Sequence, residues 1–228
     1  MLKHTKALPL VVALALAPAA FAQTSSTPAP AGSPDLGQPV GAAATNAIGT
    51  PYSAGTSGDW EERCVRAPGG HDPCQLYQLL KDSNGNSVAE FAISALAPGQ
   101  VAVAGATVVT PLETLLPRGV TLQIDSLPAK VYSYLFCAPQ GCIANVGFTA
   151  DELAAMKKGQ KILLDVASVQ SPDQPVQLTI SLKGFSQGLD AVSKLNKEHG
   201  VNPGAASAAP PAADQKPRLP GVGPAAKN

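Results

Sequence analysis

The chain has little charge and no excess of either sign. Only 14% of its 228 residues are charged, and 16 basic residues balance 16 acidic ones. A protein that binds nucleic acid through its phosphates carries a strongly basic surface. The composition excludes such a surface, and we expect no nucleic-acid partner.

Motifs for catalysis and metal binding are also missing. The sequence has no HExxH, no phosphate-binding glycine-rich loop after a strand, and no carboxylates and histidines at metal-ligand spacing. His71 is expected in an exposed loop, and His199 is expected to complement a helix dipole. We therefore predict no enzyme and no catalytic, cofactor-binding or metal-binding residues. Distant residues can still assemble a site that no local motif reveals.

Long apolar runs are absent except near the N-terminus. Lys3 and Lys6 precede the apolar run Leu8–Ala17, and the small residues of Ala20–Ala22 follow it. This pattern predicts a secretory signal peptide over residues 1–22. A transmembrane anchor is disfavoured because the run is well short of the ~20 residues that span a bilayer. The leader holds two of the 16 basic residues and no acidic one, so cleavage leaves a formal charge of −2.

Glycine and proline, by contrast, are abundant. The 21 Gly and 22 Pro are too many for one uniformly packed domain. Residues 23–57 are mainly Ala, Gly, Pro, Ser and Thr, which cannot bury enough surface to offset ordering entropy, so we predict a disordered linker. Residues 201–228 form an Ala/Pro-rich tail, predicted to be disordered or to contact anionic envelope polymers weakly. Residues 58–200 remain for one domain.

The clearest strand pattern lies in the middle of this domain. Val120–Asp125 alternates apolar and polar residues, as in a strand with one buried face. Lys130–Phe136 is a second strand candidate. It leads into Cys137–Cys142, where the chain turns back through Ile143–Val146, and this order predicts a hairpin with a cysteine at each foot.

Further strands and two helices complete the predicted fold. A capping box of Thr149 and Glu152 starts a short helix that ends at Gly159, where a left-handed cap is expected. Helical spacing of Phe185, Leu189 and Val192 predicts a final helix. These elements predict an antiparallel β-sandwich of about eight strands with two short helices. The remaining strand candidates are Gln75–Lys81, Val88–Leu96, Val101–Thr110, Lys161–Val169 and Val176–Leu182.

Four cysteines, an even number in an exported chain, favour disulfides. Sequence distance favours the pairs Cys64 with Cys74 and Cys137 with Cys142, while the other two connectivities stay open. A redox pair is disfavoured because four residues lie between Cys137 and Cys142, where thioredoxin-type motifs use two. A four-cysteine zinc site is disfavoured by the nine residues between Cys64 and Cys74.

Two groups of side chains offer alternative interpretations. Tyr132, Tyr134 and Phe136 would share one face of a strand, where they form either a contact surface for sugar or protein or part of the core. A group of acidic residues could hold a raised pKa but lies close to arginines in sequence, so a solvated charged face is the preferred interpretation. This group contains Asp59, Glu61 and Glu62, near Arg63 and Arg66.

The order of these residues resembles a known family. Trp60, Cys64 and Cys74 are followed by Pro111-Leu112, Leu116–Asp125, Phe136-Cys137, Gly141-Cys142 and Ser181–Phe185. This order resembles the invasion-associated locus B (IalB) family of Gram-negative, chiefly alphaproteobacterial, envelope proteins. The resemblance covers residues 59–194. It implies an exported β-rich domain, periplasmic or outer-membrane associated, with no established enzymatic activity and, in some pathogens, a link to host-cell invasion. The family supplies no catalytic residues, only the cysteine framework.

Our leading hypothesis is a non-enzymatic envelope protein that binds a macromolecule of the envelope or the host. The alternative is a periplasmic hydrolase or thiol-redox protein. A purely structural envelope component is a third possibility.

Overall fold

The computed structural model describes residues 47–202, and within this range the chain forms eleven strands, two α-helices and two short 3-10 helices. The predicted signal peptide, most of the predicted linker and nearly all of the predicted tail lie outside the described residues. No helix in residues 47–202 combines the length and the apolar character needed to cross a membrane.

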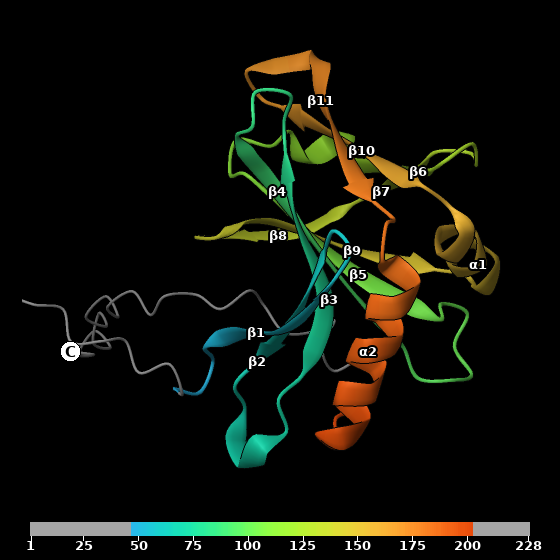
Figure 1. Cartoon of the computed structure of the whole chain (residues 1–228). Coiled ribbons are helices and arrows are strands. Elements are labelled where there is room, and N and C mark those ends of the chain that lie inside the picture. Colours follow the sequence, from blue (N-terminus) through green and yellow to red (C-terminus); the bar gives the residue numbers. More distant parts are fainter. Residues whose placement is uncertain (1–46, 203–228) are drawn as a thin grey trace, which may run out of the picture. The chain divides into compact units, whose positions relative to one another are not determined.

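The strands form two antiparallel sheets (Figure 1). The larger has the order β1-β2-β3-β4-β5-β9-β8 and the smaller the order β11-β10-β6-β7. The strands of the larger sheet are β1 Pro51–Ser57, β2 Trp60–Val65, β3 Cys74–Lys81, β4 Ser87–Ala95, β5 Ala104–Thr110, β8 Tyr134–Ala138 and β9 Gly141–Phe148. Those of the smaller sheet are β6 Val120–Ile124, β7 Lys130–Tyr132, β10 Lys161–Ser168 and β11 Ser171–Ser181. The 3-10 helices are η1 Pro68–Gly70 and η2 Leu116–Arg118.

The two sheets and helix α2 (Phe185–Glu198) enclose one hydrophobic core. Helix α2 packs beside β2, β3 and β4 (Figure 1). Trp60 is 1% exposed, and its ring lies 6.0 Å from Phe91 and 5.5 Å from Phe185. These aromatic contacts join the larger sheet to the helix, since large rings bury the most apolar surface per residue. The sandwich-like, mostly β fold predicted from the sequence is confirmed.

The predicted periodicities are confirmed in detail. Val120, Leu122 and Ile124 are buried while Thr121 and Gln123 between them are half-buried. In α2, Phe185, Leu189 and Val192 are buried, as their spacing predicts. Val176, at the start of the strand candidate Val176–Leu182, is exposed because β11 extends beyond the core before its buried part begins at Leu178.

Helix α1 (Ala150–Lys158) starts at the predicted capping box, in which the hydroxyl of Thr149 accepts from the backbone N–H of Glu152. The prediction of a left-handed cap at Gly159 is wrong, because its backbone is extended. Glycine is needed there for space: a Cβ would lie 2.2 Å from a carboxylate oxygen of Asp125. That carboxylate accepts hydrogen bonds from the N–H groups of Gln160 and Lys161 and so joins the β6 end to the start of β10.

Two predicted boundaries are wrong. Residues 51–57, assigned to the linker, form strand β1, which pairs with β2 from Pro51 opposite Val65 to Ser57 opposite Trp60. Lys130–Phe136 is not one strand. It breaks at Ser133, and its halves join different sheets as β7 and β8. The structure has eleven strands where about eight are predicted. The three additional strands are β1, β2 and the one gained by the division of Lys130–Phe136 into β7 and β8.

Candidate functional site

The structure separates the three predicted contact residues. Tyr132 lies in β7 of the smaller sheet, and Tyr134 and Phe136 lie in β8 of the larger one. A register shift between Tyr134 and Phe136 further breaks the alternation. The prediction that the three share one strand face is therefore wrong.

Their environments also differ. Tyr132 and Tyr134 pack against the core, whereas Phe136 is 54% exposed. The hydroxyl of Tyr134 lies 3.2 Å from that of Thr110, and burial raises the pKa of Tyr134. Of the three rings, Phe136 alone keeps most of its surface available for a partner.

All four cysteines are in disulfides. Cys64 is bonded to Cys74 across the adjacent strands β2 and β3, and Cys137 to Cys142 across β8 and β9. These are the pairs that sequence distance favours. A cysteine acts as a nucleophile or as a metal ligand in its thiolate form. The four disulfide-bonded cysteines therefore supply neither a nucleophile nor a metal ligand.

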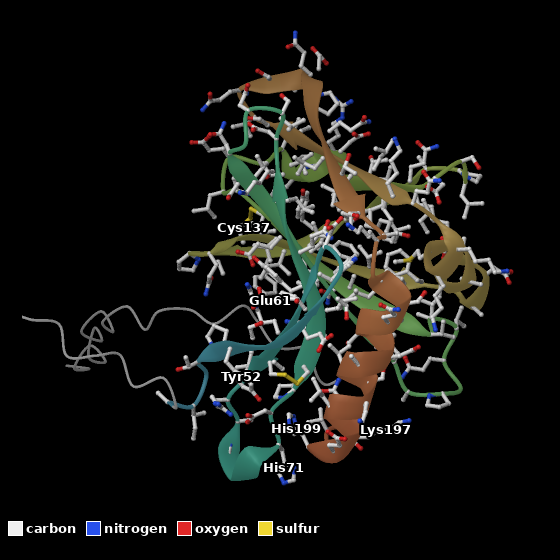
Figure 2. All side chains as sticks on the ribbon, viewed as in Figure 1. Tyr52, Glu61, His71, Cys137, Lys197 and His199 are labelled. Atoms are coloured by element: carbon white, nitrogen blue, oxygen red, sulfur yellow. A yellow bond between two sulfur atoms is a disulfide. The ribbon has the colours of Figure 1, made fainter. Side chains whose placement is uncertain are left out.

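His71 and His199, far apart in sequence, meet beside the Cys64–Cys74 disulfide at the end of α2 (Figure 2). The Nδ1 of His71 donates to the carbonyl oxygen of His199 at 2.6 Å, and the Nδ1 of His199 donates to the carbonyl oxygen of Asp72 at 2.7 Å. A catalytic histidine is usually oriented by a carboxylate. Here the Nδ1 of each ring donates to a backbone carbonyl instead, which fixes the helix end to the loop.

The carboxylate of Asp72 is directed to other partners. Asp72 is 5% exposed and accepts hydrogen bonds from the N–H of Ala67, the hydroxyl of Tyr52 and the guanidinium of Arg66. The bond from Ala67 contributes most to lowering the pKa of Asp72, and Tyr52 and Arg66 lower it further. Burial is the main cause that raises the pKa of Tyr52. This group closes the loop between β2 and β3.

The acidic residues before Arg63 are dispersed rather than clustered. Glu61 forms an ion pair with Arg63 at 2.7 Å, Glu62 accepts from Ser57, and Asp59 accepts from Ser181. The guanidinium of Arg63 also covers the ring of Tyr77 at 3.2 Å. Asp59 is exposed, but Glu61, Glu62 and Arg63 are half-buried, so the group is not the solvated charged face that the sequence predicts. In residues 47–202, no three His, Cys, Asp or Glu side chains are grouped to hold a metal ion.

The structure contains an apolar pocket that the sequence did not reveal. Its volume is about 150 Å³, and it lies between the β5–β6 connection, the ends of β4 and β10, and the middle of β11. Thr114 lines its inner side and donates to the carbonyl oxygen of Pro111 at 2.7 Å. The pocket is lined by Val88, Pro111, Glu113, Thr114, Val166, Ala167, Ser168 and Val176.

Exposed apolar side chains occur among the pocket's lining residues and next to them in sequence. We call Leu112, Leu116, Val169 and Val176 the apolar rim; all four are exposed. Backbone hydrogen bonds from Leu115 to Ala167 and from Val169 to Glu113 attach the loop to β10, so both halves of the rim have fixed positions. Leu112 and Leu116 stand near Pro111 and Pro117, but no periodic signal marks them as a surface.

The model of the invasion associated locus B (IalB) protein family matches residues 60–193. Invasion protein B homologs from Brucella abortus strain 2308 and from Brucella abortus biovar 1 strain 9-941 are each 42% identical over 82 residues, which cover 36% of this chain and 47% of the relative. The chain thus spans about half the length of these curated relatives.

The fold also occurs in a solved structure. The crystal structure of invasion associated protein B from Bartonella henselae aligns with a TM-score of 0.53 and 24% identity, covering 63% of this chain and 97% of the other. This likeness supports the fold alone. Because the family model matches more than half of the residues, the chain belongs to the invasion associated locus B family.

Proposed function

We propose that this protein is an exported, non-enzymatic protein of the Gram-negative cell envelope, periplasmic or outer-membrane associated, that binds a macromolecule of the envelope or host. In this proposal the pocket beside Thr114 receives one apolar side chain of the partner, and the apolar rim contacts the surface around it. The pocket with its rim is the observation that carries the proposal.

The size of the pocket favours a macromolecular partner over a small substrate. Sites for small molecules usually measure about 300–1,000 Å³, whereas this pocket holds about 150 Å³. A single anchor side chain in a desolvated pocket is, however, the usual centre of a protein–protein contact. The partner we propose is therefore a protein that presents one apolar anchor.

Polar groups surround the apolar centre, as in protein interfaces. Gln170 donates to the carboxylate of Glu113 at 3.4 Å, and the guanidinium of Arg118 donates to the carbonyl oxygen of Pro172. These contacts hold the rim segments together while leaving hydrogen-bonding capacity for a partner. Relatives are named invasion protein B homologs, which is compatible with a binding role in invasion.

In-cell photo-crosslinking tests this proposal. A photoreactive residue replaces Leu116 in the full chain. The variant is produced in a Gram-negative bacterium that naturally contains a protein of this family, and the cells are fractionated after irradiation. The matched control is Val101, which is 90% exposed on the β4–β5 connection. We expect a discrete adduct from position 116 in the periplasmic or outer-membrane fraction and none from position 101. Recovery only from the cytosol would contradict export, and equal adducts from both positions would contradict the binding surface.

A further inference from the structure

Strand β8 is the last strand of the larger sheet, so among the described residues only β9 pairs with it. Its outer edge therefore presents unpaired backbone groups. Leu135 and Phe136 on this strand are 60% and 54% exposed. An exposed apolar edge strand is a template for pairing with another strand.

The other three sheet edges carry features that oppose such pairing. β1 begins with Pro51 and has an irregular register between Ser53 and Gly55. β7 is three residues long and starts with Lys130, which forms an ion pair with Glu152. β11 contains Pro172, Asp173 and Pro175 in its exposed half. Proline, charge, bulges and short length are the usual protections of an edge.

β8 has few of these protections. It contains no proline, and no charged residue occurs from Val131 to Ala150. Its one irregularity lies at Leu135, which leaves an additional apolar side chain exposed. The Cys137–Cys142 disulfide fixes β8 to β9. Since the edge is already ordered, pairing costs less conformational entropy there than on a mobile strand.

We propose that β8 pairs antiparallel with β8 of a second copy of this chain, which joins the two larger sheets across a twofold axis. Complementary charges usually make an interface specific for a different protein. The β8 edge carries no charged residue and so lacks this kind of specificity. A second copy presents the same uncharged strand, so no like charges meet across the axis. This surface differs from the apolar rim, and the proposal does not depend on the proposed function.

The hairpin determines which residues of β8 direct their backbone hydrogen-bonding groups toward the open edge. The Cα atoms of Cys137 and Cys142 lie 3.9 Å apart, the close spacing of a non-hydrogen-bonded pair. The backbone N–H and C=O of Cys137 therefore point toward the open edge, whereas those of Phe136, which is paired with Ile143, face β9. We place the twofold axis at Phe136, where Phe136 forms a non-hydrogen-bonded pair with the Phe136 of the second copy. Side chains are closest in such pairs, and aromatic pairs stabilise them.

Charge substitution at position 136 tests the proposal. The full exported chain with intact disulfides is studied by analytical ultracentrifugation, as the parent protein and as the variants Phe136→Lys and Phe136→Glu. We expect the parent to dimerise and each variant, with like charges on the axis, to weaken the dimer by roughly tenfold or more. An equimolar mixture of the two variants restores the dimer, because Lys then faces Glu. Val101→Lys serves as control and leaves the dimer unchanged.

The mixture distinguishes a lost interface from a lost fold, since misfolded variants would not recover on mixing. Thermal unfolding and non-reducing peptide mapping of each variant provide the fold control. A parent protein that remains monomeric at its highest soluble concentration would overturn the proposal. Variants that dimerise as well as the parent, or a mixture that stays monomeric, would also overturn it.

Discussion

Asn196 in α2 pairs with the backbone of Cys74 in β3 through two hydrogen bonds. The N–H of Cys74 donates to Oδ1 of Asn196 at 2.7 Å, and Nδ2 donates to the carbonyl oxygen of Cys74 at 2.9 Å. The side chain thus acts like one residue of a neighbouring strand and joins the C-terminal helix to the buried disulfide.

Replacing Asn196 by Ala removes both hydrogen bonds and leaves the Cys74 N–H without its partner. An unsatisfied polar group costs about 1–3 kcal/mol, so we expect the free energy of unfolding to fall by roughly 2 kcal/mol. Urea titration followed by circular dichroism measures the change. Lys194→Ala in the same helix is the control and should change stability by less than about 0.5 kcal/mol; equal effects would contradict this role for Asn196.

The two disulfides should differ in their contributions. Chain entropy predicts about 3 kcal/mol for the ten-residue separation of Cys64 and Cys74 and about 2 kcal/mol for the five-residue separation of Cys137 and Cys142. We therefore expect the double variant Cys64→Ala/Cys74→Ala to unfold at lower urea than Cys137→Ala/Cys142→Ala. Loss of buried contacts at Cys64 and Cys74 increases the difference. The reverse order of midpoints would contradict this assignment.

Asp72 should make stability depend on acid. Its pKa in the folded chain is lowered, chiefly by the N–H of Ala67 and then by Tyr52 and Arg66. A carboxyl with a depressed folded-state pKa contributes stability that is present above its unfolded pKa of about 4 and lost as the pH falls through its folded pKa. We expect the melting temperature of the parent to fall more steeply below about pH 4 than that of Asp72→Asn. If the melting temperatures of the parent and of Asp72→Asn fall in parallel from pH 7 to pH 2, Asp72 does not contribute this pH dependence.

Gly159→Ala should destabilise the connection between α1 and β10. The added Cβ would meet the Asp125 carboxylate at 2.2 Å and the carbonyl oxygen of Ala155 at 2.9 Å. Overpacking of this kind costs about 1–3 kcal/mol. Chemical denaturation measures the loss, with Lys158→Ala at the exposed helix end as control. A variant as stable as the parent would contradict this, because it would show that the Asp125 carboxylate moves to make room for the added Cβ.

Local patterns predicted much of this fold. The alternation of Val120–Asp125, the capping box at Thr149 and the helical spacing from Phe185 depend on neighbours in sequence, and the structure contains all three elements. β1 was missed because its small polar residues have low strand propensity, so its conformation depends on pairing with β2 and on the bond from Tyr52 to Asp72.

The site was less predictable because tertiary contacts create it. The run Lys130–Phe136 has a continuous strand pattern, and nothing local indicates that the chain changes sheets at Ser133. The pocket combines side chains as distant as Val88 and Val176. Gly159 was assigned its conformation from helix-end statistics, whereas the Asp125 carboxylate determines the space available to it.

The central claim is that the pocket beside Thr114 receives a partner's side chain, and filling the pocket tests it most directly. Ala167 is buried and lines the pocket, so Ala167→Leu occupies part of its volume; Ala154→Leu on the exposed side of α1 is the matched control. The measurement is the yield of the adduct from a photoreactive residue at position 116. We predict that Ala167→Leu removes most of the adduct from a protein that still folds cooperatively and is exported, and that Ala154→Leu keeps it. An undiminished adduct in the stably folded Ala167→Leu protein would contradict the account.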